Sequence, residues 1–211
     1  METMGVNVID ALPVVFVLYS EHYQYIIKDV LGRGTCGIVY LAEMFSTKDK
    51  TSSEVALKEW VPEGYCQRMQ DMSISYKNSW ESKSSIERFT EEYKALSTIC
   101  HHNVVTVFDY LNTNGTYYYS MEYLTGGTLL DKLVCSKLFN EEQSTFFIKQ
   151  IAAGLEAFHQ KHYIHTDLQL KNIAFRSDDC IVLIDGGEDC SWRYNESQDI
   201  WALANVLLCN D

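Results

Sequence analysis

Residues 31–39 read Leu-Gly-Arg-Gly-Thr-Cys-Gly-Ile-Val, and this stretch decides how the first half of the chain is interpreted. Its glycines have the spacing G-x-G-x-x-G, which lets a backbone approach phosphate groups closely. A dinucleotide-binding fold would begin a helix directly after the third glycine, but here the β-prone residues 38–41 follow. The pattern therefore predicts a glycine-rich turn between two strands, within residues 25–41.

The sequence around this turn predicts a strand-rich first half. Residues 62–82 are polar and aperiodic, so we expect a loop or insertion there. Ser84 and Glu87 have the spacing of a capping box, which predicts that a helix opens at this point. Asn114-Gly115 lies between two β-prone runs, which is a strong hairpin signal. Strands are predicted over residues 54–60, 104–110 and 116–123.

Helical signals dominate the second half. Thr128 with Asp131, and Asn140 with Gln143, have the capping-box spacing and predict two helix starts. Apolar residues at helical spacing give the second of these helices a buried stripe, formed by Phe147, Ile151, Leu155 and Phe158.

Two further elements complete the pattern. A short buried strand is expected over residues 181–184, and an apolar helix over residues 200–208. Because strands come first and helices follow, the order predicts an α+β protein with two lobes, divided near residues 124–127.

Composition and charge exclude several classes of protein. The chain has 211 residues, of which 46% are hydrophobic and 22% are charged, so it is neither wholly disordered nor fibrous. Acidic residues number 29 against 17 Lys and Arg, and the formal net charge is −12. A field of this sign repels phosphate backbones and anionic lipids, so nucleic acid is not expected as a partner.

No membrane span, signal peptide or zinc site is expected. The longest apolar run near the N-terminus, residues 11–19, contains Pro13 and is shorter than the ~20 residues of a spanning helix. The preceding residues carry no positive charge. The seven cysteines lack a C-x-x-C pair, so we expect reduced thiols in a cytoplasmic protein. Cys100 precedes His101 and His102, but no second ligand cluster has zinc spacing.

Charged and amide residues occur at positions suited to phosphate chemistry. Lys58 ends the run Val-Ala-Leu-Lys, and its ammonium could bind phosphate oxygens while Glu92, on the predicted helix, holds it in place. Asn172 and Asp185 offer the oxygen ligands that Mg²⁺ prefers. Asp167 could accept the proton of a nucleophile. Taken singly, Lys58 could instead be a surface lysine, and Glu92 one acid on a solvated helix face.

In their order and spacing these motifs resemble the eukaryotic-type, or Hanks-type, protein kinase family, from about residue 25 to residue 211. The resemblance is carried by the glycine-rich stretch, Val55–Lys58, Glu92, His101–Val105, the hinge Met121–Thr128, Tyr163–Ile173 and Leu183–Gly187. Residues 197–203 also resemble the start of the family's helix that buries an Asp under the catalytic loop. Residues 12–25, and residues 58–62 with Arg68, are most similar to bacterial members.

The resemblance implies a two-lobed kinase-like fold over residues 23–211, after an N-terminal extension of residues 1–22. Its parts would be a β-rich N-lobe with one helix (23–122), a hinge (122–127) and a truncated helical C-lobe (128–211). The family has several more C-terminal helices than this chain. We therefore expect poorly covered apolar faces, marking a partner interface or an unstable fragment, at Ile200, Leu203 and Leu207.

The resemblance also implies ATP and Mg²⁺ as cofactors. Lys58 would orient the α- and β-phosphates and pair with Glu92. Asp167 would be the catalytic base or hydroxyl-orienting carboxylate, and Asn172 and Asp185 would hold Mg²⁺. The remaining nucleotide-binding positions would be Leu31, Gly32, Gly34, Gly37, Val39 and Ala56, with adenine at the backbone near Glu122 and Leu124 and with Met121 at the back of the pocket.

The chain departs from the family's pattern at several positions. Thr166 replaces the usual Arg, and the segment 185–199 is short and lacks Ala-Pro-Glu, so we expect no activation by loop phosphorylation. Gly186 replaces the Phe of Asp-Phe-Gly. Gln169 replaces a Lys that neutralises the transferring phosphoryl group. Lys171 is the candidate to supply that charge, and a solvent-facing lysine is the alternative.

Three functions follow from this pattern. The first is a protein kinase that transfers the ATP γ-phosphate to a Ser, Thr or Tyr hydroxyl of a protein substrate. The second is a pseudokinase that acts as a binding module for a protein partner, which the replaced residues favour. The third is a small-molecule phosphotransferase of the aminoglycoside-kinase type, which shares the His-x-Asp-x-x-x-x-Asn pattern.

Overall fold

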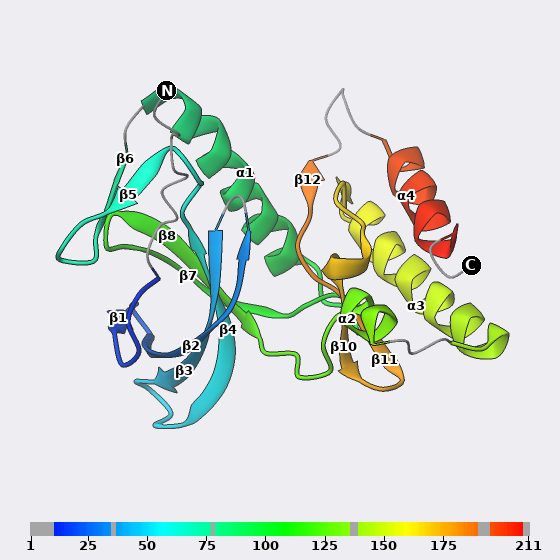
Figure 1. Ribbon diagram of the computed structural model, residues 1–211, viewed down its shortest axis with the longest axis horizontal. Coiled ribbons are helices and arrows are strands. Elements are labelled where there is room, and N and C mark those ends of the chain that lie inside the picture. The colour runs from blue at the N-terminus through cyan, green and yellow to red at the C-terminus, as the bar shows by residue number, and fades with distance from the viewer. Residues whose placement is uncertain (1–10, 35–36, 77–78, 136–138, 190–194, 209–211) are drawn as a thin grey trace, which may run out of the picture. The chain divides into compact units, whose positions relative to one another are not determined.

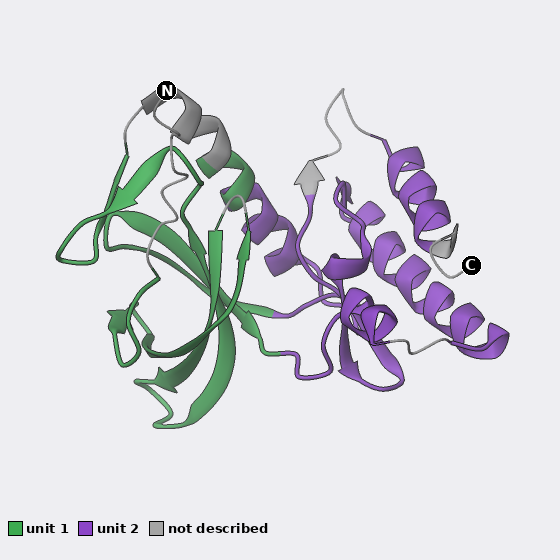
Figure 2. Cartoon of the chain, in the orientation of Figure 1, with its two compact units in different colours: residues 1–89, 107–123 green, residues 90–106, 124–211 purple. Residues whose placement is uncertain are grey.

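The computed structural model describes residues 11–34, 37–76, 79–135, 139–189 and 195–208. The chain forms two compact units, shown in Figure 2. Unit 1 comprises residues 1–89 and 107–123, and unit 2 comprises residues 90–106 and 124–211. The long helix α1, Ser79–Thr98, contributes residues to both.

Unit 1 is built on one curved antiparallel sheet (Figure 1). The spatial order of its strands is β1 (Val17–Tyr19), β2 (Tyr23–Gly34), β3 (Gly37–Ser46), β4 (Ser52–Trp60), β8 (Thr116–Glu122) and β7 (Val107–Thr113). In the β2–β3 pair, Gly34 lies opposite Gly37. The two strands predicted on either side of the glycine-rich stretch are therefore confirmed, while residues 35 and 36 of the turn lie outside the described residues.

The β7–β8 hairpin also forms where the sequence predicts it. Asn114 and Gly115 connect the two strands with φ of 55° and 71°. Both residues thus adopt the left-handed conformation that two-residue hairpin turns require, which Asn and Gly tolerate best.

Residues 62–82 were expected to be a loop or insertion, and the expectation of a loop is wrong. A second small hairpin, β5 (Cys66–Arg68) with β6 (Ile74–Tyr76), forms in this region, and α1 begins at Ser79 rather than at Ser84. The hairpin is held by contacts with distant residues, because the Ile74 N–H donates to the Asn114 carbonyl at 2.9 Å. Such contacts leave no periodic signal in the local sequence.

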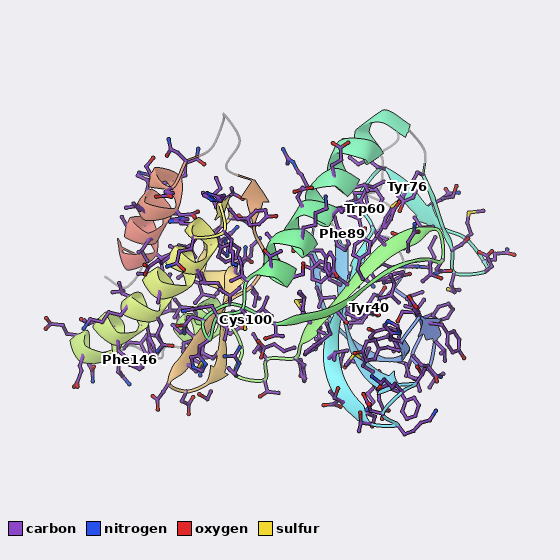
Figure 3. The ribbon with its side chains drawn as sticks, turned by 180° about the vertical axis from the view of Figure 1, so that it is seen from behind. Tyr40, Trp60, Tyr76, Phe89, Cys100 and Phe146 are labelled. Atoms are coloured by element: carbon purple, nitrogen blue, oxygen red, sulfur yellow. The ribbon has the colours of Figure 1, made fainter. Side chains whose placement is uncertain are left out.

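Large aromatic side chains fill the core of unit 1. Figure 3 labels Tyr40, Trp60, Tyr76 and Phe89, which come from β3, β4, β6 and α1. Tyr40 and Trp60 are fully buried. The Trp60 and Tyr76 rings lie 4.9 Å apart between centroids, so the β5–β6 hairpin packs directly on the strand that carries Lys58.

Unit 2 is mostly helical. Its helices are α2 (Leu129–Val134), α3 (Glu141–His159), α4 (Ser197–Leu208) and the 3₁₀ turn η1 (Leu170–Asn172), and its short strands are β9 (Tyr163–Ile164), β10 (Ile173–Ser177), β11 (Cys180–Leu183) and β12 (Glu188–Asp189). Both predicted capping boxes are present at the starts of α2 and α3. The predicted stripe of α3 is buried throughout.

Helix α4 lies beside α3 (Figure 1), and part of its apolar surface is exposed. Ile200 is 63% exposed, as expected from the sequence, whereas Leu203 is half-buried. The Leu207 side chain lies outside the described residues. Trp201 is also exposed, which the sequence analysis did not anticipate.

The strand-rich unit and the helical unit together confirm the predicted α+β class. Over the described residues, no helix combines the length and hydrophobicity that a membrane span requires. The predicted lobe and hinge boundaries stay predictions.

Candidate active site

The glycines at the β2–β3 turn differ in what they do for the fold. A Cβ atom on Gly37 would collide with the Glu59 carbonyl oxygen, so close strand packing requires this glycine. A Cβ on Gly32 or Gly34 would meet no atom within 4 Å, and neither residue has a positive φ. Since the fold does not demand these two glycines, they are available for another purpose, such as close approach of a phosphate.

Lys58 is buried within the sheet of unit 1. It lies on β4 opposite Val39 of β3 and Tyr119 of β8, and it is only 8% exposed. Its Nζ atom is 5.6 Å from the centroid of the Tyr119 ring. A surface location is thereby excluded, and burial of an ammonium is unusual unless anionic groups compensate it.

The other predicted nucleotide-binding residues of unit 1 lie on the same sheet as Lys58. Leu31 is on β2, and Ala56 on β4 pairs directly with Met121 on β8. Met121 is buried and Glu122, at the end of β8, is half-buried. Leu124, the first residue of unit 2 after β8, is half-buried as well.

In unit 2, Asp199 of α4 holds the loop that carries Asp167. Its Oδ2 atom accepts a hydrogen bond from the His165 N–H at 2.9 Å, and its Oδ1 atom accepts one from the Thr166 N–H at 3.0 Å. The His159 Nε2 atom is 2.8 Å from the same Oδ2. The predicted burial of an Asp under this loop is confirmed, since Asp199 is 1% exposed.

Asn172 connects Asp167 to the strand that precedes Asp185. Its Nδ2 atom donates to the Asp167 carbonyl oxygen and to Oδ2 of the Asp167 carboxylate, each at 2.8 Å. The Asn172 carbonyl accepts the Ile184 N–H at 3.0 Å. The three residues predicted for catalysis and metal binding are therefore brought together within unit 2.

This arrangement fits a bound Mg²⁺. The amide nitrogen of Asn172 makes both bonds to Asp167, which leaves the Oδ1 atom as the acceptor that a cation needs. Asp185 adds a carboxylate two residues after the end of β11, next to Ile184, whose N–H bonds to the Asn172 carbonyl, and adopts a φ of 57°. Oxygen ligands of this kind are those that Mg²⁺ prefers.

Gln169 also contacts the carboxylate of Asp167, the residue predicted to be catalytic. Its Nε2 atom donates a hydrogen bond to Oδ1 of Asp167, so both carboxylate oxygens accept bonds from side-chain amides. Asp167 itself is exposed. The family's Lys would place a cation at this position, whereas the Gln169 amide supplies only a dipole.

His165 is the main residue of the site that the sequence analysis missed. It is fully buried, its ring packs 5.3 Å from the Phe158 ring, and within the described part of the chain neither ring nitrogen has a hydrogen-bond partner. Burial lowers the pKa of the imidazole, although the carboxylates of Asp199, Asp185 and Asp167 act in the opposite direction. The only sequence signal was its place in His-Thr-Asp.

Gly186 packs against His165. A Cβ at position 186 would lie 2.5 Å from the His165 carbonyl oxygen and 2.7 Å from Nδ1, and Gly186 has a φ of 104°. The Gly187 N–H donates to the same His165 carbonyl at 3.3 Å. Glycine at position 186 thus follows from a close contact with the buried histidine.

Two predicted roles are not tested by this geometry. Lys171 lies on η1 and is exposed, so its part in charge stabilisation stays a prediction. Lys58 and Glu92 belong to different units, and Glu92 is half-buried on α1. Their pairing therefore also stays a prediction.

Known proteins share this organisation. The family model described as protein kinase domain matches residues 25–201. Calcium-dependent protein kinase 4 of Plasmodium falciparum is 28% identical over 185 residues, which cover 85% of this chain and 31% of that protein. Serine/threonine-protein kinase unc-51 of Caenorhabditis elegans is 32% identical over 153 residues, which cover 72% of this chain and 16% of that protein.

A human protein kinase is also similar to this chain. Serine/threonine-protein kinase ULK1 of Homo sapiens is 28% identical over 151 residues, which cover 72% of this chain and 12% of that protein. The chain thus spans less than a third of the length of each of these three relatives. Because the kinase model covers most of the sequence, the chain belongs to the Hanks-type protein kinase family.

Proposed function

We propose that this protein is an active kinase that transfers the γ-phosphate of ATP to a Ser or Thr hydroxyl of a protein substrate. The observation that carries the proposal is the link from Asp167 to Asn172 by two hydrogen bonds, and from Asn172 to Ile184, the residue before Asp185. The choice of Ser and Thr is supported by relatives named serine/threonine-protein kinases. A cytoplasmic location is supported by the scattered cysteines without a C-x-x-C pair.

Each proposed residue has a defined part in binding. The glycine-rich turn gives phosphates close access to the backbone, Lys58 neutralises the α- and β-phosphates, and Glu92 is assigned as the partner of Lys58. Asn172 and Asp185 would hold Mg²⁺, which when bound supplies positive charge to the phosphate oxygens.

The chain's own groups also prepare the acceptor hydroxyl. Asp167 is proposed to orient the Ser or Thr hydroxyl and to take up its proton as phosphate is transferred. Its carboxylate is held by Asn172, and its loop is held by Asp199, so its position is fixed before substrate binds. Such preorganisation lowers the cost of reaching the transition state.

A binding module without catalysis is the second candidate, because Gln169 occupies Oδ1 of Asp167. A hydroxyl must compete with this amide for the carboxylate. Nucleotide binding and phosphate transfer must therefore be measured separately.

The first experiment is a thermal melt of the purified protein with and without millimolar Mg-ATP. We expect a rise in melting temperature, since a ligand that binds only the folded state stabilises it. Lys58→Met should abolish the rise, whereas Lys28→Met, at an exposed lysine on β2, should keep it. A folded wild-type sample that shows no rise would overturn the nucleotide site.

The second experiment measures transfer of labelled γ-phosphate to protein acceptors and to an aminoglycoside. Label on Ser or Thr of protein supports the proposal. Label on the aminoglycoside alone makes the chain a small-molecule phosphotransferase, and binding of Mg-ATP without any transfer makes it a pseudokinase. The proposal is overturned in either case.

A further inference from the structure

A cysteine, a histidine and an arginine meet in unit 2, outside the residues assigned to the kinase site. The Cys180 Sγ atom is 3.1 Å from the His102 Nε2 atom. The Arg176 Nη1 atom donates to the same sulfur at 3.5 Å and to the His102 carbonyl at 2.6 Å. The three groups come from the turn after α1 and from strands β10 and β11, so they form a constructed cluster rather than an isolated thiol.

Backbone pairing fixes the cluster. Cys180 begins β11 and pairs with Ser177 across the β10–β11 turn, labelled in Figure 1. Residues beside His102 are joined to β11, because the Asn103 side chain donates to the Ile181 carbonyl at 2.7 Å and the Leu183 N–H donates to the Asn103 carbonyl at 2.9 Å. The fold thus fixes the backbone next to His102 beside β11, within reach of the Cys180 sulfur.

Two basic side chains contact the Cys180 sulfur. His102 can accept the thiol proton, and Arg176 then faces the thiolate with a positive charge. Asp178 and Asp179, in the adjacent turn, oppose this, but both are exposed, and Lys132 forms an ion pair with Asp178 at 3.2 Å. The other neighbouring histidine, His101, accepts the Asn103 N–H through Nδ1.

Cys66 in unit 1 provides a contrast within the same chain. Both cysteines are thiols and both are buried, at 3% exposure for Cys66 and 7% for Cys180. The Cys66 thiol donates its hydrogen bond to the Pro62 carbonyl at 3.3 Å. Because a carbonyl oxygen accepts its hydrogen, Cys66 serves as the matched comparison thiol.

We propose that Cys180 is a peroxide-reactive thiol, with His102 as its base and Arg176 as its cationic contact. The thiolate attacks one oxygen of a hydroperoxide, so that an S–O bond forms and the O–O bond breaks. Sulfur is oxidised by two electrons to sulfenic acid, and the peroxide is reduced. The leaving oxygen takes the proton that His102 accepted from the thiol, which gives water or an alcohol. A small peroxide would reach the sulfur, on a residue that is 7% exposed, from the side of the exposed His102.

The test treats the intact protein with hydrogen peroxide in the presence of dimedone, which traps sulfenic acid, and measures each cysteine by peptide mass spectrometry. We expect Cys180 to be labelled at least about tenfold faster than Cys66. His102→Asn and Arg176→Gln should each slow labelling of Cys180, whereas His22→Asn, at an exposed histidine of unit 1, should not.

Two results would overturn the proposal. One is labelling of Cys180 no faster than that of Cys66 in the wild-type protein. The other is an unchanged Cys180 rate in a folded His102→Asn variant, with folding checked by thermal melting. If that variant does not fold, the proposal is judged only by the labelling rates of Cys180 and Cys66 in the wild-type protein.

Discussion

At the scale of single residues, the buried His165 accounts for the glycine at position 186. The family has Phe at position 186, but here the buried imidazole and the His165 carbonyl fill the space that a Cβ would need. The positive φ of Gly186 adds a second reason for glycine. The replacement of the family's Phe by Gly186 therefore follows from local packing and does not by itself indicate loss of function.

The first prediction is that Gly186→Ala lowers the free energy of unfolding by about 1–3 kcal/mol, through strain and overlap with His165. Urea denaturation measures this. Gly32→Ala is the matched control and should change stability far less, because its Cβ meets no atom within 4 Å and its φ is not positive. Equal losses in the two variants would contradict the account.

The second prediction concerns pH. Burial keeps the pKa of His165 below its ordinary value, so the unfolded chain binds a proton more readily than the folded one. The resulting stability is fully present above about pH 6.5, the pKa of an unfolded histidine, and is lost as the pH falls below it. We expect the urea midpoint of the wild-type protein to decrease as the pH is lowered from 7 to 5. The decrease should be smaller in His165→Leu. Parallel pH profiles of the two proteins would refute this role.

The third prediction concerns the missing cation. If Lys171 neutralises charge that Gln169 cannot, Lys171→Ala should lower the phosphate-transfer rate by about 100- to 1,000-fold with little change in ATP affinity. Gln169→Lys should raise the rate and soften the loss in the double variant, since the two positions would share one role. Equal rates in wild type and Lys171→Ala would leave Lys171 as a solvated residue.

At the scale of elements, a buried ion pair joins the β5–β6 hairpin to the main sheet. Arg68 of β5 contacts Glu59 of β4 through both terminal nitrogens, at 2.6 and 3.1 Å, and both side chains are almost fully buried. Tyr40 and Tyr118 donate hydrogen bonds to the same carboxylate at 2.6 and 2.7 Å. Burial alone would lower the pKa of Arg68, but Glu59 outweighs it and the pKa is raised.

The fourth prediction is that Arg68→Met lowers the free energy of unfolding by about 3–5 kcal/mol, because it leaves a buried carboxylate without its cation. Adding Glu59→Gln should recover part of the loss, since no unpaired charge then remains. Denaturant unfolding of the single and double variants measures both effects. A loss in Arg68→Met no larger than in Lys28→Met, where the lysine pairs at the surface, would disprove the ion pair's role.

Elements were predictable where the signal was local. Capping boxes at Thr128 and Asn140 and the Asn114-Gly115 turn each lie within four residues, and each formed as expected. The β5–β6 hairpin was missed because it depends on Glu59 and on Asn114, which are distant in sequence. The start of α1 was placed too late because a capping-box pattern can also occur inside a helix.

At the scale of the whole molecule, the order of motifs carried more information than any one of them. Lys58, Asp167, Asn172 and Asp185 could be proposed from the sequence because phosphate-transfer chemistry restricts residue type and spacing, and their roles stay predictions. The contacts of His165, His159 and Gln169 could not be predicted from the sequence. They depend on how α3, α4 and the loop that carries Asp167 pack together. The substrate of the proposed reaction could not be predicted either, because no local sequence pattern specifies it.

The most direct test of the central claim is transfer of labelled γ-phosphate from ATP with Mg²⁺, compared between wild type and Asp167→Asn in one assay. The asparagine keeps the shape of the side chain but cannot accept a proton. We expect incorporation into protein Ser or Thr by the wild type, reduced by about 100-fold or more in the variant. Wild-type incorporation no greater than that of Asp167→Asn, in folded samples that bind Mg-ATP, would contradict it.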